Sequence, residues 1–224
     1  MADTKISGLG AVTTLADTDL ITVVTGTSPT QVNKKITSAD LKTFSKGSAQ
    51  IGSTMYRQKF FGIGGTTGFN PTLTSGCGAI AQLETGTYKN VFDYLPFDSS
   101  STERAYINYM FPSDYTGGNV YSKYLWTHPA TTVNFGISFA FTGLSSADNT
   151  SLDLNIGTSI FVVDTGGITS NFYLSPLSSA ITLAGSPGSQ QNMYFRISRV
   201  PSEAGDNMMV DAYLLGVLFY YPVA

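Results

Sequence analysis

The sequence is short of charged residues. Asp, Glu, Lys and Arg make up 12% of its 224 residues, against about 25% in an average soluble protein. The 12 basic and 15 acidic residues give a formal net charge of -3. This balance offers no basic surface that would neutralise nucleic-acid phosphates. We therefore expect no binding to nucleic acid.

Cysteine and histidine each occur once, as Cys77 and His128. A single cysteine excludes a disulfide within the chain, and one residue of each type cannot supply a zinc site with the usual ligand spacing. Cys77 lies among small residues in SGCGA and is interpreted as a packed thiol, while His128 is interpreted as a loop residue beside Pro129. We expect neither a metal site nor a cofactor.

Long hydrophobic runs are also missing. No apolar stretch approaches the roughly 18 residues that a membrane-spanning helix requires. The opening MADTKISG lacks the basic segment and apolar run of a secretion signal. We expect no membrane insertion and a protein that is assembled in a cytoplasm.

Candidate catalytic groups are few and match no motif. Four acidic residues near predicted loops could form the carboxylate pair of a glycosidase: Asp93, Asp98, Glu103 and Asp114. Asp17 and Asp19 resemble the start of a calcium loop, but the further ligands and the turn glycine do not follow. These residues are interpreted as turn-forming or solvated groups. No catalytic residue is assigned, and we expect that the protein is not an enzyme.

Residues 1–44 differ in pattern from the rest of the chain. TDLITVV and QVNKKIT are typical of two strands joined by the turn TSPT, which predicts a hairpin. TSADLKTF predicts a short helix, because Thr37 or Ser38 can cap its first N–H groups. A unit of this size has too little core to be stable alone, so we expect it to bind a partner. Its candidate attachment residues are Leu9, Leu20, Val23, Ile36, Leu41 and Phe44.

Residues 45–55 are small and polar and are predicted to be a linker. From residue 56 to residue 224, short apolar segments alternate with Gly, Pro, Ser and Asn clusters. TVNFGISFAF, SLDLNIG and NMYFRISRV each show the period of two that is typical of a half-buried strand. This pattern predicts a mainly β fold, a jelly-roll-like antiparallel β-sandwich.

Two features of the predicted sandwich leave alternatives open. In MMVDAYLLGVLFYY, residues 213–221 are apolar on both faces. This strand lies either at the centre of the sandwich or against a neighbouring subunit. Arg196, Arg199 and Asp211 occur in otherwise apolar or mixed strands. A buried charge needs a partner, so we expect an ion pair between Asp211 and one of the two arginines.

The segment AYINYMFPSDYTGGNVYSKYLW, residues 105–126, is rich in aromatic residues. Aromatic rings can stack on sugars while Asn side chains bind hydroxyl groups. Five residues could form such a glycan or receptor platform: Tyr115, Asn119, Tyr121, Tyr124 and Trp126. Alternatively, the aromatic residues line the inner face of a sandwich and form part of its core.

Two parts of the sequence resemble proteins of tailed bacteriophages. KISGL, TTLADTDLITVV and QVNKKITSADLKTF, between Lys5 and Phe44, resemble the short N-terminal module of phage appendage proteins, namely tail fibres and related virion fibres. FRISR and DNMMVDAYLLGVLFYY, near the C-terminus, resemble the closing strands of β-rich phage tail or head-fibre domains.

The resemblance implies a non-enzymatic virion protein, a homotrimer whose residues 1–44 attach to other phage tail or capsid proteins. Its leading version is a tail-fibre or receptor-binding appendage that contacts a host surface glycan. The alternative is a head fibre or capsid decoration protein that stabilises the shell.

Overall fold

The computed structural model describes two segments of the hairpin, Leu20–Thr25 and Val32–Thr37, then Ser48–Ile51, and residues 54–65, 68–129 and 135–223. The chain divides into two compact units, Met1–Ala49 and Gln50–Ala224. The predicted linker, residues 45–55, contains this division, strand β3 (Ser48–Ile51) and the start of β4 (Thr54–Phe61). No helix long and apolar enough to cross a membrane occurs among the described residues.

The first unit contains the predicted hairpin. Strands β1 (Leu20–Thr25) and β2 (Val32–Thr37) pair antiparallel, with Leu20 opposite Thr37 and Val23 opposite Lys34. Ile36 is opposite Ile21 in the same register. The hairpin prediction is thereby confirmed. Several predictions fall outside the described residues: the turn at Asp17 and Asp19, the helix that follows the hairpin, and the attachment residues Leu9, Leu41 and Phe44.

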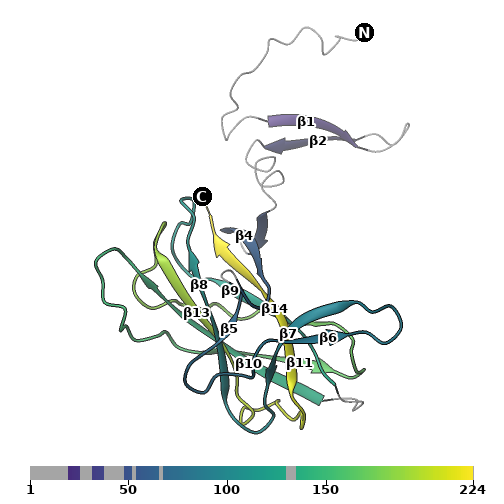
Figure 1. Ribbon diagram of the computed structural model, residues 1–224. Helices are drawn as coiled ribbons and strands as arrows, with labels where there is room; N and C mark the ends of the chain where they lie inside the picture. The colour runs from purple at the N-terminus through teal and green to yellow at the C-terminus, as the bar shows by residue number, and fades with distance from the viewer. Residues whose placement is uncertain are drawn as a thin grey trace, which may run out of the picture. The chain divides into compact units, whose positions relative to one another are not determined.

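The second unit is built from two sheets (Figure 1). The five-stranded sheet has the order β11 (Ile160–Gly166), β10 (Phe135–Ser146), β13 (Asn192–Arg199), β8 (Glu103–Met110) and β5 (Asn70–Pro71). The seven-stranded sheet has the order β12 (Tyr173–Leu174), β9 (Tyr121–Thr127), β14 (Ala212–Pro222), β4 and β3. Its remaining strands are β6 (Ala81–Glu84) and β7 (Val91–Phe97), which pair with each other, and β7 also pairs with β14.

Eight of these strands have the order of a jelly roll. In one sheet the neighbours are β4, β14, β9 and β12, and in the other they are β8, β13, β10 and β11. If β4 is numbered 1 and β8 to β14 are numbered 2 to 8, these orders become 1-8-3-6 and 2-7-4-5. This is the double Greek key of a jelly roll. The predicted β-sandwich is therefore confirmed.

The core lies between the sheets and follows the period-two pattern. Phe135, Ile137, Phe139 and Phe141 of β10 are buried. Met193, Phe195 and Ile197 of β13 are buried as well. Each fully buried side chain of this size stabilises the fold by about 1.5–3 kcal/mol relative to its exposed state.

Strand β14 occupies the centre of its sheet. It pairs with β9 along one edge and with β4 and β7 along the other. Val217 and Phe219 lie in the core, and Leu215 and Tyr220 are also buried. Of the two alternatives for this doubly apolar strand, the described residues therefore support the central position.

SLDLNIG, residues 151–157, was expected to be a strand and is not one. Leu152 of this segment is 88% exposed. Its last residue is hydrogen-bonded to the edge of β10: the Gly157 N–H donates to the Gly143 carbonyl (3.1 Å), and the Thr142 hydroxyl donates to the Gly157 carbonyl. The alternation of leucines lacks a neighbouring strand to pair with, so it does not produce a ladder.

Candidate functional site

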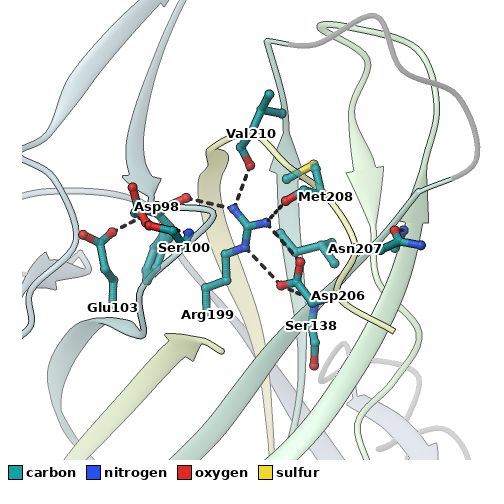
Figure 2. A network of polar contacts seen from close by, with 12 residues as sticks. Asp98, Ser100, Glu103, Ser138, Arg199, Asp206, Asn207, Met208 and Val210 are labelled. Atoms are coloured by element: carbon teal, nitrogen blue, oxygen red, sulfur yellow. Dashed lines mark hydrogen bonds and ion pairs between the residues drawn. The ribbon is translucent and has the colours of Figure 1, made fainter. Parts of the chain in front are cut away.

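A buried arginine lies at the end of β13, inside the sandwich (Figure 2). Arg199 Nε and Nη2 donate to the two carboxylate oxygens of Asp206, at 3.1 and 3.0 Å. Nη2 also donates to the Met208 carbonyl (2.6 Å), and Nη1 donates to the carbonyls of Phe97 (3.1 Å) and Val210 (2.8 Å). A guanidinium has five N–H donors, and all five of them have acceptors here.

Asp206 belongs to the loop between β13 and β14, residues 200–211, and this loop also completes the hydrogen bonding of β10. The backbone N–H of Ser138 donates to Asp206 Oδ2 (3.2 Å), and the N–H of Gly136 donates to Asn207 Oδ1 (2.7 Å). In return, the Asn207 N–H donates to the Gly136 carbonyl (3.1 Å). The loop therefore bonds to β10 beyond the point where β13 ends, and the arginine cluster holds that loop in place.

The expected ion pair with Asp211 was wrong, because the partner of Arg199 is Asp206. Arg196, the other expected partner of Asp211, takes part in none of the ion pairs between described residues. Alternation along β13 places Arg199 on the core face, opposite Glu103, and Arg196 on the outer face, opposite Tyr106. Residues three positions apart on a strand point to opposite faces.

The four candidate carboxylates lie in ordinary polar contacts. Asp98 accepts hydrogen bonds from the backbone N–H and hydroxyl of Ser100, both at 2.6 Å, and from the Ser101 N–H (2.8 Å). These bonds, those of Ser100 above all, lower the pKa of Asp98 to about 2. The interpretation of Asp98 as a turn-forming residue is confirmed.

Glu103 lies beside this turn. Its Oε2 accepts the Asp98 backbone N–H at 2.7 Å, and burial raises the pKa of its carboxyl. The remaining two carboxylates are elsewhere: Asp93 Oδ1 accepts from Gln82 (3.0 Å), and Asp114 pairs with Arg57 (2.6 Å).

Cys77 and His128 are both buried. Burial, with a smaller contribution from Glu103, raises the pKa of the Cys77 thiol to about 12, which keeps the thiol protonated and unreactive at neutral pH. The interpretation of Cys77 as a packed thiol is confirmed. The His128 ring packs edge-on against Phe135, with centroids 4.6 Å apart.

The proposed aromatic platform does not form at the surface. Tyr115, Tyr124 and Trp126 are buried in the core. Tyr115 stacks on Phe111 at 3.8 Å, and Trp126 Nε1 donates to Asp164 Oδ2 at 2.8 Å.

The other two members of the platform lie apart from these core residues. Tyr121 is half-buried and packs edge-on against Tyr56 at 5.3 Å, and exposed Asn119 accepts a hydrogen bond from Thr182 (2.9 Å). Alternation along β9 puts Tyr124 and Trp126 on the face opposite to Tyr121. The alternative that the aromatic residues are core is correct for Tyr115, Tyr124 and Trp126.

A groove on the outer face of the five-stranded sheet is the better candidate for a binding site. Its volume is about 710 Å³, within the roughly 300–1,000 Å³ that is typical of small-molecule sites. Its floor is formed by Leu144 and Ser146 of β10, Asn192, Tyr194 and Arg196 of β13, and Asn108 of β8. Its wall is formed by Leu152, Asp153, Leu154, Asn155 and Ile156.

The groove combines amide, aromatic and cationic groups. Asn108, Asn155 and Asn192 each offer both donors and acceptors. The Tyr194 ring stacks on the ring of Tyr106, with centroids 5.5 Å apart and planes 17° apart. Burial, and then the neighbouring Arg104, lower the pKa of Arg196.

Sequence reasoning did not find this groove, although part of the signal was present. NMYFRISRV places Tyr194, Arg196 and Ser198 on the face opposite to its core residues. A strand whose outward face carries Asn, Tyr and Arg is a candidate binding surface. The wall is not predictable in this way, because the alternation in residues 152–156 predicts a strand.

No family model matches the chain, and no curated protein sequence matches it. Among solved structures, the chain is similar to an isomalto-dextranase from Arthrobacter globiformis T6 in complex with panose, with 13% sequence identity and a TM-score of 0.42. The match covers 73% of this chain and 23% of that enzyme, so the chain spans less than a quarter of its length. Similarity at this level indicates no shared function.

Proposed function

We propose that the chain is a non-enzymatic structural protein of a bacteriophage virion, a tail-fibre or receptor-binding appendage. Its first unit attaches the protein to another virion component, and its sandwich binds a saccharide of the host surface in the groove of the five-stranded sheet. The lining of this groove is the observation that carries the proposal.

Three asparagines and one tyrosine line the groove together with aliphatic side chains. Side-chain amides can donate to and accept from sugar hydroxyls at the same time. An aromatic ring and aliphatic groups supply apolar contact for the faces of a sugar ring. Most residues that line the groove are polar, which suits a ligand that is itself rich in hydroxyl groups.

The division of the chain supports the attachment role. The hairpin of β1 and β2 belongs to a compact unit separate from the sandwich, and the pattern of residues 5–44 resembles phage attachment modules. A two-stranded hairpin is at best marginally stable by itself. The first unit is therefore expected to gain stability from the virion protein that it binds, in a homotrimer as the resemblance implies.

A head fibre or capsid decoration protein is the second candidate. The low charge of the chain, 12% of its residues, favours it, because charged residues are depleted from the cores of protein interfaces. In that case the sandwich would bind neighbouring shell subunits rather than a saccharide.

Electron cryo-microscopy of the phage particle that carries this chain distinguishes the two. We expect density for the sandwich at the tail, with the groove of the five-stranded sheet facing outward. Density distributed over the shell and absent from the tail would establish the decoration role instead.

Saccharide binding is tested with the full-length chain on an array of bacterial surface polysaccharides. Replacing Asn108 of the groove by Ala is expected to weaken binding. Asn119→Ala is the matched control, because this asparagine is also exposed but lies outside the groove. Equal binding by the two variants would contradict the assignment of the groove.

A further inference from the structure

Arg196 lies on the floor of the groove without a counter-charge. It takes part in none of the ion pairs between described residues, which join Arg57 to Asp114, Lys89 to Glu84 and Arg199 to Asp206. Its Nε atom is buried and has no hydrogen-bond acceptor in the described part of the chain. A buried donor without an acceptor costs free energy, and a ligand oxyanion that binds the guanidinium group would offset this cost.

A second cation lies close by. Arg104 of β8 is opposite Ser198, and Tyr106 is opposite Arg196, so the two arginines share the outer face on neighbouring strands. Asp153 is the single carboxylate among the described residues that line the groove, and it is exposed on the wall. Two guanidinium groups close together repel each other. An anionic group of the ligand that binds at the floor of the groove would relieve that repulsion.

We propose that the groove binds an acidic saccharide, with the carboxylate or phosphate of the sugar held by Arg196. This inference rests on the proposed saccharide binding and specifies the chemical class of the ligand. The planar guanidinium matches the geometry of both oxyanions and can donate two parallel hydrogen bonds to either.

The groups around Arg196 suit the rest of such a ligand. Tyr194 precedes it by two residues on the same face of β13, and Asn192 precedes Tyr194 in the same way. Asn108 is opposite Tyr194 on β8. The cation, the aromatic ring and two amides thus form one continuous surface, along which a charged sugar and its neutral neighbour can bind together.

The test uses the full-length chain and paired probes. Bacterial oligosaccharides that contain uronic acids are compared with the same oligosaccharides after reduction of the carboxyl groups to alcohols. Oligosaccharides that contain phosphate are compared with their dephosphorylated forms. We expect affinity for the acidic member of a pair to exceed that for the neutral member on the order of tenfold to a hundredfold, the usual value of a charge-assisted hydrogen bond.

Arg196→Gln is expected to lose this preference, and Arg196→Lys to keep part of it. Lys59→Gln is the matched control, because it removes the same charge from an exposed position on β4 in the other sheet. Equal thermal unfolding of the wild type and Arg196→Gln confirms that the loss is not caused by misfolding.

The outcomes separate the two proposals. A preference removed by carboxyl reduction identifies a uronic acid type of ligand, and one removed by dephosphorylation identifies a phosphorylated sugar. Equal binding of acidic and neutral members would overturn the role of Arg196 and leave saccharide binding intact. No binding to any probe would overturn both.

Discussion

Arg199 and Asp206 form a bidentate ion pair inside the sandwich, with each carboxylate oxygen accepting one guanidinium N–H. The side chains are 0% and 1% exposed. Backbone carbonyls of Phe97, Met208 and Val210 accept the remaining donors. Phe97 belongs to β7, and Met208 and Val210 belong to the loop before β14. This one side chain therefore connects the five-stranded sheet with β7 of the other sheet and with that loop.

Removing one partner of this pair leaves an uncompensated buried charge. We expect Asp206→Ala to lower the free energy of unfolding by about 3–5 kcal/mol, measured by denaturant unfolding. Glu84→Ala is the control, because the Lys89–Glu84 side chains are 66% and 55% exposed and such pairs contribute about 0–1 kcal/mol. Similar losses for the two variants would show that the buried pair has no special role.

Trp126 is the single tryptophan of the chain, and its side chain is buried in the core. Its fluorescence in the folded protein is therefore expected to resist quenching by iodide and to become quenchable on unfolding. Trp126→Ala should lower the free energy of unfolding by about 3–5 kcal/mol, as for other buried aromatic residues. Strong quenching in the folded state would show that Trp126 is exposed, and would support the aromatic platform as a binding site.

The Asp98 turn gives a prediction for pH dependence. The ordinary pKa of this carboxyl, 3.8, is lowered to about 2 by hydrogen bonds from Ser100 and Ser101. A lowered pKa in the folded state means that the ionised carboxylate stabilises the fold at neutral pH, and that this contribution is lost as the pH falls from about 4 to about 2.

Carbon-detected NMR titration should therefore find the Asp98 midpoint well below that of an unstructured peptide. The stability difference between the wild type and Asp98→Asn should be largest near neutral pH and should shrink across the same interval. A midpoint close to 4 would mean that the serine hydrogen bonds do not persist in solution.

Local patterns predicted the parts of this fold that depend on local geometry. The alternation of Phe135, Ile137, Phe139 and Phe141 identified β10 and its core face, because the period of a strand is a property of the backbone. The same rule, applied strictly, separates Tyr121 from Tyr124 and Arg196 from Arg199. The aromatic platform and the Asp211 ion pair are wrong because each combines residues of one chemical type that lie on opposite faces of a strand.

Contacts between distant residues were not predictable from such patterns. The partner of Arg199 depends on how residues 200–211 turn back toward β10, and nothing in the local sequence distinguishes Asp206 from Asp211 as that partner. SLDLNIG shows the opposite case, since its alternation is correct for a strand but no neighbouring strand pairs with it. The groove exists because this segment instead forms a wall beside β13.

Asp153 on that wall provides a final prediction for ligand binding. Its carboxylate is exposed, and it would repel an anionic ligand held by Arg196. Asp153→Asn is expected to raise the affinity for an acidic saccharide by about twofold to fivefold, the range expected for one solvent-exposed charge interaction. Added salt should weaken binding by the wild type and reduce the difference between the two proteins, because salt screens exposed charges. Affinity that falls in Asp153→Asn would instead identify this carboxylate as an acceptor for sugar hydroxyls.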